Sequence, residues 1–184
     1  MRGLRTFLTL TLLTFTSACS LAPGVLLTPT PTLFVYPSAA VTPIPPLTAE
    51  QVKNAEYTLT GFDNSSQTYR FVDGKYNKGT DPAAPDFVDI QLLDILPFGD
   101  LNADGVSDAA AIIAENYGGT GVFVSVAAVL NENGQPRHVA STLVDDRPQI
   151  NKLEIRDGEI FLDAVVHGLQ DPGCCPTFAV TRSS

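Results

Sequence analysis

The sequence predicts an all-β, mainly antiparallel domain that follows one short helix and an N-terminal region of different composition. Short segments rich in β-branched and aromatic residues recur at close spacing after residue 55. Turn-forming residues separate these segments, and helical periodicity is almost absent. Many short strands joined by tight turns predict a meander that closes into a sandwich or a barrel.

Residues 1–18 have the composition of a signal peptide. Arg2 and Arg5 precede an uncharged, mostly apolar run at residues 6–16. This run is too short to span a bilayer, which takes about 20 residues. The small residues Ser17 and Ala18 directly before Cys19 resemble the lipobox of bacterial lipoproteins.

The lipobox resemblance implies cleavage before Cys19, diacylglycerol on its thiol and acylation of the new amine with a fatty acid such as palmitate. Two or more acyl chains give stable anchoring to a membrane. The alternative is an ordinary signal peptide followed by an incidental cysteine.

Residues 19–47 are expected to form a tether rich in proline and threonine. Residues 20–47 contain seven of the 14 prolines of the chain. Proline fixes φ and has no N–H, so neither a helix nor a central strand is expected there. The tether is therefore expected to be semi-rigid, although the apolar segment 33–36 is also compatible with pairing to a sheet edge.

Residues 48–184 are expected to form the β-rich globular domain. Thr48 and Gln51 have the spacing of a capping box and predict a short helix. Asp-Gly at residues 73–74 and 157–158, and a loop at residues 131–136, predict β-hairpins. The other expected strands cover residues 57–60, 67–72, 87–96, 108–116, 122–131, 137–144 and 177–182.

The segment "DAAAIIAEN" at residues 108–116 is rich in alanine and is therefore also compatible with a helix. Its two isoleucines and the glycines at 118, 119 and 121 favour a strand that ends in a turn. The near-continuous apolar run at residues 122–131 predicts a central strand covered on both faces.

The stretch "FGDLNADGVSD" at residues 98–108 predicts a calcium site. Its oxygen-bearing side chains occupy alternate positions and are followed by Gly105, as at the start of an EF-hand loop. In a loop that curls around an ion, every second side chain points inward, and Ca²⁺ prefers such hard oxygen ligands. The expected ligands are Asp100, Asn102, Asp104, the carbonyl of Val106, and Asp108.

The loop departs from the EF-hand at the twelfth position, where Ala111 replaces the usual glutamate. It resembles the calcium-binding loops of FG-GAP repeats, which join two strands. The resemblance implies the local site and no propeller, because a propeller needs several repeats. A metal-free loop of Asx turns and another metal are the alternatives, and we expect weak calcium affinity, about 10⁻⁴–10⁻³ M.

The adjacent cysteines Cys174 and Cys175 predict a vicinal disulfide, because an exported compartment is oxidising. Their Cα atoms are expected to lie about 3.8 Å apart, below the usual range of about 4.4–6.8 Å for a disulfide. Free thiols, or a metal or redox role, are the alternatives. His167 lies nearby in the sequence, but the spacing fits no zinc pattern.

The charge excludes some partners. Cleavage before Cys19 would remove two arginines and no acid, and would change the net charge from −9 to −11. Such an acidic surface argues against nucleic acid or anionic lipid as a partner. The chain also has none of the common motifs of nucleotide binding, zinc proteases or serine hydrolases.

The lipobox-like start, the proline tether, the acidic loop and the terminal "CCPT" together resemble a group of small bacterial lipoproteins. The resemblance implies a location and no activity. We expect an extracytoplasmic β domain anchored to a membrane through lipid on Cys19 and stabilised by calcium. Its expected role is binding, with a protein or glycan partner left open, or envelope structure.

Two enzymatic alternatives remain open. One is an extracytoplasmic hydrolase that acts on envelope or extracellular polymer through acidic residues. The other is a thiol-redox module that uses Cys174 and Cys175. The sequence assigns no catalytic residue to either activity.

Overall fold

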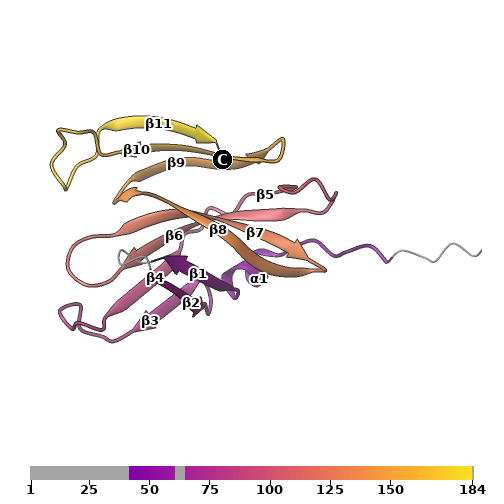
Figure 1. The fold of residues 1–184 in the computed structure, drawn as a ribbon, viewed down its shortest axis with the longest axis horizontal. Helices are drawn as coiled ribbons and strands as arrows, with labels where there is room; N and C mark the ends of the chain where they lie inside the picture. Colours follow the sequence, from indigo (N-terminus) through magenta and orange to yellow (C-terminus); the bar gives the residue numbers. More distant parts are fainter. Residues whose placement is uncertain (1–41, 61–64, 184) are drawn as a thin grey trace, which may run out of the picture. The chain divides into compact units, whose positions relative to one another are not determined.

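The computed structural model describes residues 42–60 and 65–183 (Figure 1). The expected signal peptide, Cys19 and the tether up to residue 41 lie outside the described residues. The elements are α1 (Ala49–Lys53), β1 (Glu56–Thr60), β2 (Ser66–Arg70), β3 (Lys75–Lys78), β4 (Val88–Leu92), β5 (Phe98–Gly99), β6 (Asp108–Asn116), β7 (Phe123–Glu132), β8 (Gln135–Asp146), β9 (Gln149–Arg156), β10 (Glu159–Val166) and β11 (Phe178–Ser183).

The strands form three antiparallel sheets. The largest has the order β3-β4-β6-β7-β8, with the short β5 paired beside β6. A second sheet has the order β11-β10-β9, and β1 pairs with β2 in the third. The prediction of a mainly antiparallel all-β fold is confirmed, and the described residues form a sandwich-like arrangement with no closed barrel.

The largest sheet is covered on both faces. Ala109, Ala111 and Ile113 of β6 pack in one core, with α1 and the β1–β2 pair. Ala110 and Ile112 of the same strand pack in a second core, with β9 and β10. Successive side chains of a strand point to opposite faces, so β6 contributes to both cores, and the alanine-rich segment is a strand, as expected.

The predicted capping box at the start of α1 is confirmed. The backbone N–H of Gln51 donates to Thr48 Oγ1 at 3.2 Å, and Thr48 N–H donates to Gln51 Oε1 at 2.9 Å. The Gln51 amide then reaches Gly134 O at 2.8 Å, between β7 and β8. The preceding Leu47 is buried in the first core, so the packed part of the chain includes the last residue assigned to the tether.

Two of the three expected hairpins are confirmed. Asn133-Gly134 joins β7 to β8, and Asp157-Gly158 joins β9 to β10. All four residues have positive φ, between 53° and 84°, as the two-residue turn that matches the twist of paired strands requires.

The third expected hairpin forms only at its turn: Val72 and Lys75 make an isolated antiparallel bridge across Asp73-Gly74, but the strands on either side pair elsewhere. Asp73 and Gly74 adopt the same positive φ values, 51° and 77°. However, β2 pairs with β1 whereas β3 pairs with β4. Phe71 is fully buried and its N–H donates to Ala55 O at 3.0 Å, which holds the chain before the turn on the β1 side.

A buried carboxylate lies at the end of β6. Glu115 is 6% exposed and accepts hydrogen bonds from Tyr117 Oη at 2.5 Å and Ser125 Oγ at 3.3 Å. Among the described residues it makes no ion pair with a cationic side chain. Burial raises the pKa of the Glu115 carboxyl, and the two hydroxyl donors only partly offset that effect.

We therefore expect Glu115→Gln to stabilise the protein at neutral pH relative to acidic pH. A raised folded-state pKa contributes stability that is fully present below the unfolded pKa of about 4.3 and is lost as the pH rises through the folded pKa. Glutamine stays neutral and can keep both hydroxyl contacts. Urea unfolding at pH 4 and pH 7 measures the difference, and Glu159→Gln, on the exposed end of β10, controls for loss of one negative charge. If Glu115→Gln and the wild-type protein showed the same difference in stability between pH 4 and pH 7, the raised pKa of Glu115 would be contradicted.

Candidate functional site

The acidic loop, residues 100–107, joins β5 to β6. Phe98 pairs with Ala109, and Gly99 pairs with Asp108 at the base of the loop. Ala103 and Gly105 have positive φ values of 61° and 82°. A positive φ is strained for alanine, because of its Cβ atom, whereas glycine adopts it without strain. The loop therefore curls tightly between two antiparallel strands.

The polar side chains at alternate positions make hydrogen bonds within the loop, and Asn102 and Asp104 are exposed. Asp100 Oδ2 accepts from Gly105 N at 2.9 Å, Asn102 Oδ1 from Asp104 N at 3.1 Å, and Asp104 Oδ1 from Val106 N at 2.7 Å. Asn102 Nδ2 also donates to Asp104 Oδ2 at 2.9 Å. These Asx-type contacts are compatible both with a metal-free loop and with a loop shaped for an ion.

One oxygen of the loop has no donor. Asp100 Oδ1 is buried and lacks a hydrogen-bond partner. An unsatisfied buried acceptor costs about 1–3 kcal/mol, and more when charged, so a cation or a water molecule would be favourable there. The donor set of carboxylate, amide and carbonyl oxygens fits calcium. Nevertheless, within residues 42–60 and 65–183, no three acid, histidine or cysteine side chains gather as a metal group.

Asp108 lies at the base of the loop and is fully buried. Its Oδ2 accepts from Leu101 N at 2.8 Å, and its Oδ1 accepts from Asn131 N at 2.8 Å. Hydrogen bonds to an ionised acceptor are about twice as strong as neutral ones. A carboxylate oxygen has a second lone pair, so Asp108 remains available to an ion, but its observed contacts close the loop and connect it to β7.

The side chain of Asn131 connects three segments of the chain, which the sequence does not indicate. Its amide donates to Pro45 O at 2.9 Å and to Ser107 O at 3.3 Å, and its Oδ1 accepts from Gly134 N at 2.7 Å. One buried side chain thus connects the end of the tether, the end of the acidic loop and the β7–β8 turn. The only sequence signal is an asparagine shortly before Asn-Gly, which is common in turns.

The other side of the loop packs against the β9–β10 hairpin. A Cβ atom added to Gly99 would lie 2.6 Å from Ile155 Cγ2, closer than real contacts allow. A Cβ atom on Gly158 would lie 3.9 Å from Leu101 O and 4.0 Å from Asp100 O. Glycine at residue 99 therefore permits the second sheet to approach the acidic loop, whereas a Cβ atom on Gly158 would make only ordinary contact and glycine there serves the turn, with φ of 81°.

The cysteine pair lies in the exposed loop between β10 and β11. Cys174 and Cys175 are joined by a disulfide, with Cα atoms 3.8 Å apart. Asp171 organises this loop, since its carboxylate accepts from Gly168 N at 2.9 Å and from both Thr177 N, at 2.7 Å, and Thr177 Oγ1. These donors, the Gly168 N–H first, lower the pKa of Asp171.

Asp145 and His167 are 22 residues apart in the sequence but form hydrogen bonds in the structure. No sequence motif indicates this contact. Asp145 Oδ2 accepts from the backbone N–H of His167 at 2.5 Å and lies 2.9 Å from its Nδ1. Partial burial disfavours the carboxylate, but the hydrogen bonds from His167 outweigh it and lower the pKa of Asp145. His167 Nε2 is buried without a hydrogen-bond partner.

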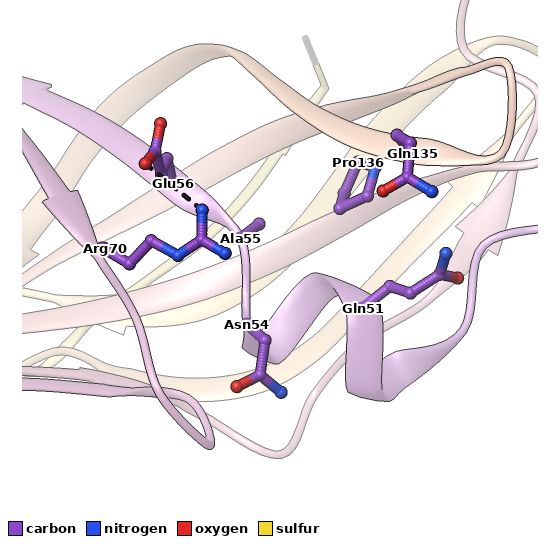
Figure 2. Close-up of a pocket in the computed structure, with 7 residues that line it drawn as sticks. All are labelled: Gln51, Asn54, Ala55, Glu56, Arg70, Gln135 and Pro136. Carbon is purple, nitrogen blue, oxygen red and sulfur yellow. Dashed lines mark hydrogen bonds and ion pairs between the residues drawn. The ribbon is translucent and has the colours of Figure 1, made fainter.

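A polar hollow of about 290 Å³ lies between α1, the β1–β2 pair and the start of β8 (Figure 2). Gln51 and Asn54 line it, but their amides already bond to Gly134 O and Glu50 O. Arg70 is paired with Glu56 at 3.3 Å. Most polar groups of the hollow therefore hold the elements together.

Comparison with protein-family models, with curated proteins and with solved structures finds no match to this chain. Among the described residues, no helix has both the length and the apolar composition needed to cross a membrane.

We predict that Asp108→Asn lowers the free energy of unfolding by about 2–4 kcal/mol, because the N–H of Leu101 or the buried N–H of Asn131 loses its acceptor and a charge-assisted bond is lost. Urea unfolding in EDTA separates this effect from any bound metal. Asp104→Asn is the matched control in the exposed part of the loop and should cost less than about 1 kcal/mol. Equal effects of the two substitutions would show that Asp108 has no special structural role.

Proposed function

We propose that this chain is a lipid-anchored protein of a bacterial envelope, whose extracytoplasmic β domain is stabilised by calcium and serves a binding or envelope-structural role. The observation that carries the calcium part is the unsatisfied, buried Asp100 Oδ1 within a loop whose polar side chains accept N–H groups of its own backbone. The lipid part rests on the lipobox-like residues before Cys19.

Asp100, Asn102, Asp104, the Val106 carbonyl and Asp108 would hold the ion, and water would complete its coordination shell. Calcium at this place would have a structural effect. The loop is tied to β7 through Asp108 and Asn131 and packs against β9 through Gly99. An ion would offset the repulsion among the three carboxylates of the loop, and it would therefore strengthen the attachment of the loop to β7 and β9.

A binding or structural role has more support than an enzymatic one. A hydrolase of the expected kind would need a pair of catalytic carboxylates, and neither the sequence nor the geometry described above assigns such a pair. A redox role would be favoured by a free cation beside the cysteine pair. Arg147 approaches Gly173, next to Cys174, but Asp146 accepts from its guanidinium at 3.0 and 2.6 Å.

Calcium at 5 mM should stabilise the full chain by about 1–2 kcal/mol, as expected for a site with a dissociation constant of about 10⁻⁴–10⁻³ M. Thermal melts with calcium and with EDTA, together with titration calorimetry, measure this. Asp100→Asn should abolish the effect, whereas Asp157→Asn, in the β9–β10 turn, should retain it. The absence of both binding heat and a shift in melting temperature would refute the calcium site.

In a bacterial host, the full chain should be recovered in the membrane fraction as a mature protein that begins at an acylated Cys19. Cys19→Ser should lose incorporated palmitate and the processed N-terminus, whereas Cys174→Ser should retain both. Mass spectrometry of the N-terminal peptide gives the measurement. An unmodified Cys19 peptide from wild-type protein would rule out the lipid anchor.

A further inference from the structure

The last strand of the largest sheet has a free edge. β8 pairs with β7 on one side, and within the described part of the chain no strand pairs with its other side. Residues 139–143, with the sequence Val-Ala-Ser-Thr-Leu, are all exposed, and the side chain of Leu143 is 51% exposed. Natural edge strands are commonly protected by charged residues or proline. This five-residue stretch contains neither.

An apolar hollow of about 230 Å³ opens beside this edge, between β8 and the β10–β11 pair. Its lining includes Val126, Val144, Ile160 and Leu162, which all pack in or against the second core. Thr142 and Leu143 of the free edge complete one side. A cavity of about 150 Å³ admits benzene, whereas typical small-molecule pockets have about 300–1,000 Å³. The hollow therefore suits one large aliphatic or aromatic side chain.

Arg182 of β11 lines the same hollow. The other arginines of the described ranges each have a carboxylate partner, and they are Arg70, Arg137, Arg147 and Arg156. Arg182 makes no such pair with a described residue, in a chain with 20 acidic and 11 basic side chains. An available cation beside an apolar hollow complements a ligand that carries an apolar group close to a negative charge.

We propose that this edge binds an extended peptide segment of a partner protein. The segment would pair its backbone with residues 141–144 of β8, place one apolar side chain in the hollow and direct an acidic side chain to Arg182. Strand addition supplies affinity through main-chain hydrogen bonds and specificity through alternate side chains. Residues two apart in a strand share a face and lie about 6.6–6.8 Å apart, so the recognised pattern is an apolar residue and an acid separated by one position.

This inference deepens the proposed binding role by naming the chemistry of the partner. It does not depend on lipid at Cys19 or on calcium. Its failure would therefore leave the palmitate and calcium measurements untouched, and their failure would leave the peptide measurement interpretable.

The test uses the purified full chain and a fluorescent nonapeptide of threonine and serine that carries a central leucine and an aspartate two residues later. Fluorescence anisotropy should show saturable binding. Arg182→Glu should weaken binding about five- to tenfold and should favour a peptide with lysine in place of aspartate. Arg70→Glu is the matched control, since it makes the same charge reversal on the distant β1–β2 pair, and should bind like wild type.

Backbone pairing has its own readout. In an added strand, alternate N–H groups point toward the edge or away from it. Two peptides, each N-methylated at one of two adjacent residues, should therefore differ: one should lose binding and the other should retain it. Equal binding of both, no binding of the parent peptide, or equal effects of Arg182→Glu and Arg70→Glu would overturn the proposal.

Other occupants of the hollow would also overturn it. Saturable binding of dodecanoate without binding of the peptide would assign the hollow to an acyl chain. Self-association of the wild-type chain in sedimentation equilibrium, lost in Arg182→Glu, would assign the edge to a second copy.

Discussion

The rest of the structure depends on the hydrogen bonds that the buried carboxylate of Asp108 accepts. This carboxylate accepts one backbone N–H from the acidic loop and one from β7, both at 2.8 Å. Because Asp108 begins β6, the same residue sets where the loop ends and where the central strand starts. Asn131 extends this connection to Pro45 and to the β7–β8 turn. A carboxylate enclosed by backbone donors thus locates three segments that are distant in sequence, and glycine at residue 99 lets the second sheet pack against the loop.

Local features of the fold were predictable because their causes are local. The capping box needs only Thr48 and Gln51, and the turns at residues 133–134 and 157–158 need residues that tolerate positive φ. The turn at residues 73–74 shows the limit of this reasoning. Its backbone conformation was predictable, but strand pairing depends on the burial of Phe71 and its bond to Ala55. Those constraints come from packing, which a turn sequence does not encode.

The candidate site was predictable to a similar extent. The side chains of Asp100, Asn102 and Asp104 accept hydrogen bonds from backbone N–H groups of their own loop, and their expected role as calcium ligands stays a prediction. The structural role of Asp108 was not predictable, because its second donor, Asn131, lies 23 residues away. The contact of Asp145 with His167, and the hollow beside Arg182, likewise arise only when separate strands meet. Composition indicated an acidic surface but gave no sign that Arg182, alone among the arginines of the described residues, would have no carboxylate partner there.

The position of β6 between two cores has a consequence for how this domain tolerates sequence change. Ala110 and Ile112 serve one core while Ala109, Ala111 and Ile113 serve the other. A shift by one residue would exchange the two sets of side chains, because the side-chain period of a strand is two. Substitutions of similar volume can accumulate separately on each face, whereas a single insertion or deletion in β6 would disturb both cores at once. During evolution, length variation in this domain should therefore be confined to its loops, and β6 should keep a constant length.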